Sequence, residues 1–286
     1  MFAIIGFVVV LVAVIGGYVL EHGNLSVLFQ PVELLIIGGA ALGGFLIANP
    51  KKVVALVTKD IMNVFKGKEI PKQTYLDLLL LMFEFLTVAR REGMIALEDH
   101  VNQPEKSKIF IKYPSVLENH HLRDFICDNL KAYISGSIDP PEFENLMDID
   151  LEAQEGNSVL SSGAVANVAD SLPGLGIVAA VLGVVITMGK IKEPPEVLGH
   201  SIGAALVGTF LGVLMCYGFA GPMSQNLGHQ AREKETLLKV AKAALLGFGQ
   251  GVPPMLAVEI ARRAIPGADR PSYEELENAL KFARKK

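Results

Sequence analysis

The chain has 286 residues, of which 51% are hydrophobic and 20% are charged, and its formal net charge is −4. Its mean hydropathy of +0.40 is too high for an ordinary soluble domain and indicates a membrane protein. The charges are spread along the chain without a dense basic patch, which argues against a nucleic-acid-binding protein. The two cysteines, Cys127 and Cys216, fall in a hydrophilic and an apolar segment, so we expect no disulfide between them.

Four windows are apolar and long enough to cross a bilayer, which takes about 20 residues. They are Phe2–Leu20, Val32–Ala48, Leu172–Met188 and Ile202–Gly221. The first lacks the basic start and the small-residue cleavage site of a secretory signal, so we expect it to be retained as a span.

The distribution of basic residues predicts the orientation of these spans. Of the 26 Lys and Arg residues, 13 lie in residues 50–169 and 11 in residues 222–286. The positive-inside tendency therefore places the long loop, the tail and both termini in the cytoplasm. The lysines that directly follow the second span carry most weight; they are Lys51, Lys52, Lys59, Lys66 and Lys68.

The hydrophilic parts are expected to be helical. Leu76–Leu86 is apolar on most faces, but Asp77 and Glu84 favour a buried helix over a fifth span, and Gly93 would end it. Leu122–Ser135 has apolar residues at helical spacing.

Further helix signals follow along the chain. Pro140 suits a helix start, and near the end of the tail Glu275 follows Ser272 by three residues, which is a capping box. Strand signals are nearly absent. We predict an all-α membrane protein with four transmembrane helices and a helical cytoplasmic domain formed by the long loop between spans two and three and by the C-terminal tail. The expected divisions are 1–49 for spans one and two, 50–169 for the cytoplasmic domain, 170–221 for spans three and four, and 222–286 for the cytoplasmic tail.

Nothing in the sequence indicates a metal or a catalytic group. Six acids and no base lie between Glu142 and Glu155, which is more typical of a solvated helix face than of an ion site. The six histidines form no ligand set with neighbouring acids. We therefore expect no cofactor and no enzymatic activity.

Small residues recur in the last two spans. Ala204, Gly208 and Gly212 are spaced by four residues, and Gly176, Ala180 and Gly183 recur in the third span in the same way. Such stripes let helices approach closely. They indicate either a surface for a helix of another protein or packing among the four spans of this chain.

Polar groups are rare within these spans. Thr209 is the main hydroxyl, with Tyr217 and Thr187 nearer the ends, whereas Glu33 and Asp170 lie at span boundaries. A proton path needs a titrating group within the membrane. Either the chain moves no protons, or a partner supplies the carboxylate.

Two prolines flank the last two spans. Pro173 is expected in the first turn of its helix, where a missing N–H costs little, and Pro222 is expected to end the fourth span.

These segments resemble the MotA family of flagellar motor stator proteins. The resemblance is carried by "DSLPGLGIVAAVLGVV", "VGTFLGVLMCYGFAGP", "SGSIDPPEFENLMD" and "ARREGMIALEDH", and it extends over essentially the full length. It implies a multi-pass protein of the bacterial inner membrane. It also implies a ring of five MotA subunits around two MotB, whose single spans supply the proton-binding aspartate, and a contact with the rotor protein FliG.

The resemblance also implies roles for particular residues. Pro173 and Pro222 match two prolines at the channel that shape its conformational change, and Thr209 matches a hydroxyl near the partner's aspartate. Arg90 and Glu98 match charged residues that contact the rotor; composition alone would make them ordinary surface charges.

The transported ion is expected to be the proton. Sodium-driven relatives tend to carry hydroxyl residues where this chain has Ala180 and Gly208, which leaves Thr209 alone. With fewer side-chain oxygens, the spans have less to replace the water molecules that surround a sodium ion.

Other classes fit the sequence less well. A proton-driven energy transducer of the ExbB or TolQ kind normally has three spans. A polytopic membrane enzyme needs a nucleophile with a base, or a metal set. A channel that works without a partner needs its own intramembrane acid.

Overall fold

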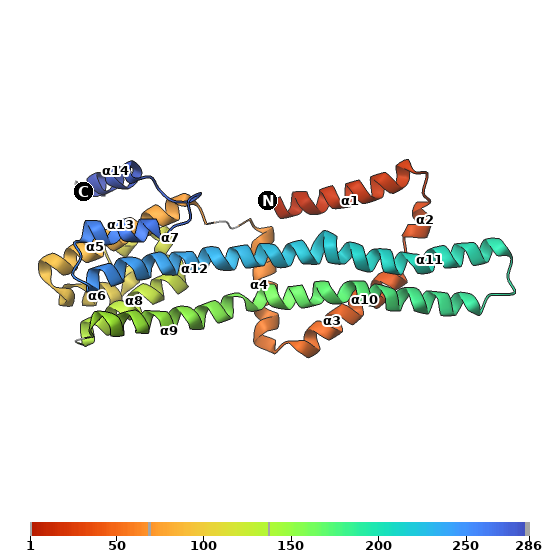
Figure 1. The fold of residues 1–286 in the computed structure, drawn as a ribbon, viewed down its shortest axis with the longest axis horizontal. Coiled ribbons are helices and arrows are strands. Elements are labelled where there is room, and N and C mark those ends of the chain that lie inside the picture. The colour runs from red at the N-terminus through yellow and green to blue at the C-terminus, as the bar shows by residue number, and fades with distance from the viewer. Residues whose placement is uncertain (1, 68–69, 137, 284–286) are drawn as a thin grey trace. The chain divides into compact units, whose positions relative to one another are not determined.

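The computed structural model describes residues 2–67, 70–136 and 138–283, and within these ranges the chain forms helices and no strand (Figure 1). Two compact units emerge, each made of two segments. Unit 1 comprises Met1–Lys68 and Ser158–Gln230, and unit 2 comprises Glu69–Asn157 and Ala231–Lys286. These borders differ from those expected at 49, 169 and 221, because the ends of the loop segments pack with the apolar helices.

Unit 1 contains the apolar helices. Among the described residues, four helices are long and apolar enough to cross a membrane, as the sequence predicted. The elements of the unit are α1 (Phe2–Leu20), α2 (Leu25–Leu28), α3 (Pro31–Ala48), α4 (Lys51–Phe65), α10 (Leu160–Met188), α11 (Pro195–Leu214), the π-helix η4 (Met215–Ala220) and the start of α12 (Gly221–Gly249).

Helix α4 was not predicted, although its signal is present in the sequence. Val53, Val57 and Val64 lie on one side of the helix and are buried, and α4 packs on α10. Ser161 at the start of α10 donates a hydrogen bond of 2.6 Å from Oγ to Asp60 Oδ2 of α4. An amphipathic helix therefore joins the apolar helices directly after the second span.

Unit 2 is a helical domain with its own core. Its elements are α5 (Lys72–Glu92), η1 (Met94–Leu97), α6 (Glu98–Asn102), η2 (Pro104–Lys106), η3 (Phe110–Lys112), α7 (Pro114–Leu117), α8 (His120–Ser135), α9 (Pro140–Ser158), the end of α12, α13 (Pro254–Arg263) and α14 (Tyr273–Ala283). The helices expected near Leu76–Leu86, Leu122–Ser135 and Pro140 are present.

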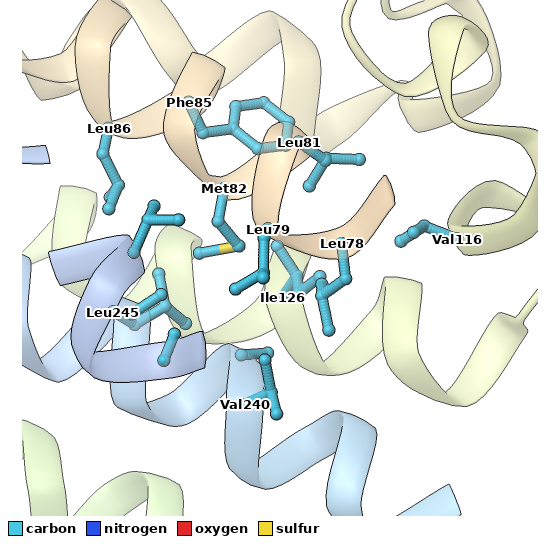
Figure 2. Packing of buried hydrophobic residues seen from close by; sticks show 14 of the residues in the cluster. Leu78, Leu79, Leu81, Met82, Phe85, Leu86, Val116, Ile126, Val240 and Leu245 are labelled. Atoms are coloured by element: carbon cyan, nitrogen blue, oxygen red, sulfur yellow. The ribbon is translucent and has the colours of Figure 1, made fainter. Parts of the chain in front are cut away.

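Helix α5 lies at the centre of this domain. Figure 2 shows Leu78, Leu79 and Met82 of α5 packed among side chains from other segments, including Ile126 and Val240. The two acids that argued against a fifth span have partners. Ser115 Oγ donates to Asp77 Oδ2 at 2.6 Å, and Tyr113 Oη and Lys112 Nζ each donate to the Glu84 carboxylate at 2.7 Å. The prediction of a buried helix is confirmed.

Two further sequence signals correspond to observed contacts. Glu275 N–H donates to Ser272 Oγ at 3.0 Å and Ser272 N–H donates to Glu275 Oε2 at 2.6 Å, which completes the predicted capping box. The acidic run on α9 is not only a solvated face, because Lys242 Nζ of α12 donates to Asp148 Oδ1 at 2.6 Å.

A buried ion cluster holds the end of α13. Glu259 is 9% exposed and accepts hydrogen bonds from Arg262 at 2.7 and 2.8 Å and from Arg263 at 3.0 Å. Arg262 also donates to the carbonyl of Pro271 at 2.9 Å, which ties α13 to the segment before α14. The hydrogen bond from Arg262 lowers the pKa of Glu259 from 4.5 to about 2, with a smaller contribution from Arg263.

We predict that Glu259→Gln lowers the free energy of unfolding of unit 2 by about 3 kcal/mol at pH 7, since each pKa unit corresponds to about 1.4 kcal/mol. The folded pKa is lower than the unfolded value of 4.5, so this stabilisation is present above pH 4.5 and is lost as the pH falls towards 2. Denaturant titrations of the solubilised chain at pH 7 and pH 3 would measure it, and the difference at pH 3 should be less than half of that at pH 7.

The matched control is Glu277→Gln, which removes an exposed pair with Lys281 at 2.9 Å on α14. Exposed pairs contribute about 0–1 kcal/mol, so this variant should unfold almost as the wild type does. Equal destabilisation by the two substitutions would contradict the assigned role of Glu259.

Candidate functional site: the paired helices α10 and α11

Helices α10 and α11 run side by side in unit 1 and touch through glycines (Figure 1). A methyl group placed on Gly176 would lie 2.8 Å from Gly208 O and 3.0 Å from Gly212 Cα. Contacts of this kind leave no room for a side chain, so the backbones are in direct contact at this level.

The same close packing continues along the two helices. A methyl group on Gly183 would lie 2.8 Å from Ala205 Cβ, and one on Gly208 would lie 3.0 Å from the backbone nitrogen of Ala180. Ala180 is buried in this contact, whereas Ala204 is half-buried. Of the two interpretations left open by the sequence, packing within the chain is the one observed for Gly176, Gly183, Gly208 and Gly212. We call these four glycines the glycine seam.

Thr209 of α11 and Tyr217 of the π-helix η4 each carry a hydroxyl group. Thr209 is half-buried, Val213 is 40% exposed and Tyr217 is 73% exposed, and these residues recur every four positions. Among the described residues the Thr209 hydroxyl takes part in no hydrogen bond, so it does not bond back to its own helix. Large apolar residues of α10 and α11 are also exposed; they include Ile177, Val178, Val181 and Leu206. Unit 1 therefore presents an apolar surface with hydroxyl groups that form no hydrogen bond within the described residues.

Pro173 does not lie in the first turn of its helix, and that expectation is wrong. Helix α10 begins at Leu160, so Pro173 lies inside it. The polar residues before the apolar window are also helical, and the helix therefore starts well before the membrane segment. A proline at this place removes the hydrogen bond to the carbonyl of Ala169 and loosens the helix locally.

Pro222 likewise lies inside a continuous helix and not at its end. Residues Met215–Ala220 form the π-helix η4, and the helix continues as α12 from Gly221. Pro222 cannot donate to the carbonyl of Gly218, and its ring would clash there in a regular α-helix. The wider π turn, in which Gly221 N–H bonds to Cys216 O, accommodates the proline. Both prolines thus interrupt the regular bonding of helices that form the seam.

Sequence reasoning missed the position of Glu33. The residue lies in the first turn of α3, at the edge of the apolar window, but its side chain is only 9% exposed. It points at the glycine seam, since a methyl group on Gly208 would lie 3.0 Å from Glu33 Oε2. Of the two acids at span boundaries, Asp170 is exposed and Glu33 is buried. The sequence feature that could have drawn attention to Glu33 is its position as an acid in an otherwise apolar segment.

The two charged residues expected at the rotor contact lie in unit 2. Arg90 is in the last turn of α5 and Glu98 is the first residue of α6. Both are exposed, and within the described ranges neither forms an ion pair. Their charges are therefore available to another molecule.

A metal centre finds no support in the described part of the chain, where no group of three His, Cys, Asp or Glu residues could hold an ion. The two cysteines are buried and unbonded, and burial raises the pKa of the Cys127 thiol to about 12. That thiol is therefore not a reactive nucleophile.

Comparison with known proteins agrees with this geometry. Residues 4–93 match the motility protein A N-terminal family, and residues 117–239 match the MotA/TolQ/ExbB proton channel family. Motility protein A of Salmonella typhimurium is 39% identical over 284 residues, covering 99% of this chain and 96% of that protein. Motility protein A of Escherichia coli is 38% identical over the same length and with the same coverage.

A solved structure shares the fold. The structure of the flagellar MotAB stator complex from Bacillus subtilis contains a chain that matches with a TM-score of 0.76 and 25% identity, covering 94% of this chain and 97% of that one. The fold class predicted from the sequence is therefore confirmed. The chain belongs to the MotA/TolQ/ExbB proton channel family, and its full-length relatives in Salmonella typhimurium and Escherichia coli are both named motility protein A.

We predict that Gly176→Ala destabilises the seam, because the added methyl group meets the backbone of α11, which cannot move aside as a side chain can. Overpacking of this kind costs about 1–3 kcal/mol. The midpoint of thermal unfolding of the solubilised protein should fall.

Gly174→Ala is the matched control on the same helix, because a methyl group there has no atom within 4 Å. Alanine is the better helix former by about 1 kcal/mol, so this variant should be at least as stable as the wild type. Equal thermal midpoints for the two variants would contradict the close contact.

Proposed function

We propose that this chain is the stator subunit of a flagellar motor that couples proton flow across the bacterial inner membrane to torque on the rotor. The observation that carries the proposal is the tightly packed α10–α11 pair, on which the hydroxyls of Thr209 and Tyr217 form no hydrogen bond within the described residues. Such a surface suits a neighbouring helix that brings its own carboxylate. The full-length similarity to motility proteins supports the same function.

The proposed partner is a single-span protein of the MotB type, whose aspartate binds the proton next to Thr209. The relative from Bacillus subtilis is described as a MotAB stator complex, which supports a complex of the two proteins here. We expect a ring of five copies of this chain around two partner spans. The uncovered apolar residues of α10 and α11 would then contact the partner helices or neighbouring copies.

The proposed orientation places both termini and unit 2 in the cytoplasm. It rests on the basic residues of residues 50–169 and 222–286. Arg90 and Glu98 are then exposed towards the rotor protein FliG. Exposed ion pairs contribute about 0–1 kcal/mol each, which suits a contact that must break at each step.

Pro173 and Pro222 are the proposed flexing points. Each interrupts a helix of the seam, so a change of charge at the partner's aspartate can shift the ends of α10 and α12 without breaking the glycine contacts. One charge crossing 100 mV supplies about 2.3 kcal/mol, so one proton drives only a small step. No cofactor is needed for this mechanism, and no catalysed reaction is proposed.

The proposed ion is the proton. Ala180 and Gly208 face each other in the seam and offer no side-chain oxygen, so Thr209 supplies the hydroxyl of this region. We predict that swimming speed at a fixed proton-motive force does not change when sodium is replaced by potassium. Tracking cells in matched media measures this, and motility that stops without sodium would refute the assignment.

We further predict that Arg90→Glu leaves membrane insertion intact and reduces swimming by an order of magnitude or more, because the rotor then meets a repelling charge. The control is Lys108→Glu, another exposed base outside any ion pair in the described structure, which should swim as the wild type does. Immunoblots of membrane fractions verify insertion.

A charge reversal on the rotor protein that restores swimming to Arg90→Glu would establish direct pairing. Loss of the variant from the membrane fraction, or normal swimming with the reversed charge, would contradict the proposed contact.

A further inference from the structure

The side chain of Glu33 fills the space that two seam glycines leave open. A methyl group on Gly208 would lie 3.0 Å from Glu33 Oε2, and one on Gly183 would lie 3.5 Å from Glu33 Oε1. Helix α3 packs on both α10 and α11, which brings the carboxyl group to their contact. Gly208 lies six residues after Ile202, about 9 Å along the helix from the start of the apolar window. The acid therefore lies inside the apolar layer.

The carboxyl group has an oxygen without a partner. Glu33 Oε2 is buried and accepts no hydrogen bond, and it is the one such side-chain atom in the described part of the chain. No basic residue lies on α2, on α3 or in the segments 171–188 and 201–214 of α10 and α11. Polar groups that are buried in native proteins nearly always have a partner, so this exception calls for a physical reason.

No other titratable side chain in the described residues forms a hydrogen bond or an ion pair with Glu33. On α1 and directly after it, Tyr18 and Glu21 line a groove of about 550 Å³ against Gly203 and Leu206 of α11. The Tyr18 hydroxyl donates to Asn24 O at 3.3 Å and is not directed to Glu33. Helix α2 has no titratable side chain, α10 has none after Asp170, and α11 has none after His200. No group on the packed elements compensates a negative charge on Glu33.

An ionised carboxylate in such a place is very unfavourable. Transfer of an unpaired charge to an apolar medium costs several kcal/mol even after relaxation, whereas an unpaired neutral polar group costs about 1–3 kcal/mol. The arrangement seen here is therefore that of the neutral acid, which carries a proton. For the acid to ionise, water must reach it, and α3 must separate from the seam.

We propose that Glu33 is a proton-binding site of this chain itself, in which the protonated acid stabilises the packing of α3 on the α10–α11 seam and ionisation opposes it. By linkage, any change that separates α3 from the seam releases this proton, and binding of the proton favours the packing of α3 on the seam. This site is separate from the carboxylate that the partner supplies. Its contribution to an ion path depends on the proposed function, whereas the protonation itself does not.

The test is infrared spectroscopy of the full-length chain in lipid vesicles without a partner, so its outcome is independent of the flagellar motor. At pH 7 the wild type should show the carbonyl band of a protonated carboxylic acid, and Glu33→Gln should lose that band. Glutamine has nearly the same size and stays neutral, so the variant should remain folded. The control Glu21→Gln changes an exposed acid and should keep the band.

A second measurement separates a proton-binding site from an acid that is only structural. Spin labels on Leu35 of α3 and Val181 of α10, both exposed, report the separation of α3 from the seam. In the wild type the carbonyl band should disappear as the pH rises, and the separation should increase over the same pH range. In Glu33→Gln the separation should not depend on pH.

Three results would overturn the proposal. The band is absent from the wild type at pH 7; the band persists at every pH at which the protein stays folded; or the band disappears while the helix separation stays constant. Failure of the motility experiments with a positive infrared result would instead contradict the stator assignment and leave the protonation of Glu33 in place.

Discussion

The close contact of α10 and α11 through glycines is the constraint on which the rest of the membrane unit depends. Gly176, Gly183, Gly208 and Gly212 bring two backbones together so tightly that no side chain fits between them. In lipid, apolar side chains gain little from associating with one another, and close backbone packing replaces the hydrophobic effect as the source of stability. The Glu33 carboxyl group lies at the edge of the seam, and the buried Thr187 hydroxyl of α10 donates to the carbonyl of Gly183 in its own helix.

This constraint also explains how the helices can move without coming apart. Pro173 and the π-helix before Pro222 lie towards the same end of the α10–α11 pair, because Gly212 packs against the carbonyl of Leu172. Regular hydrogen bonding is weakened at this end and is retained along the rest of the seam. A rigid pair of helices with one adaptable end can transmit a displacement from the apolar layer towards the helix that follows. The Thr209 hydroxyl lies in the rigid part, whereas Tyr217 is exposed on the π-helix.

The sequence predicted what depends on local chemistry and missed what depends on distant contacts. Hydropathy located four spans, and the spacing of Ser272 and Glu275 gave the observed helix cap. The position of Pro173 was misjudged because the apolar window and the helix do not begin at the same residue. The acid in an apolar segment marked Glu33 as unusual, but its burial could not be inferred, since it depends on glycines about 150 and 175 residues away that only the fold brings close. Helix α4 was missed for another reason. Val53, Val57 and Val64 recur at helical spacing, so this helix could have been predicted from the sequence.

The central claim is that this chain supplies packed, nearly uncharged helices, while the acid that carries each ion across the membrane belongs to another protein. Proton flux into vesicles that contain the full-length chain, measured with and without the single-span partner under an imposed membrane potential, tests it most directly. The account predicts flux close to that of empty vesicles for the chain alone and a clear increase when the partner is present. Equal proton flux from the chain alone and from the complex would contradict it.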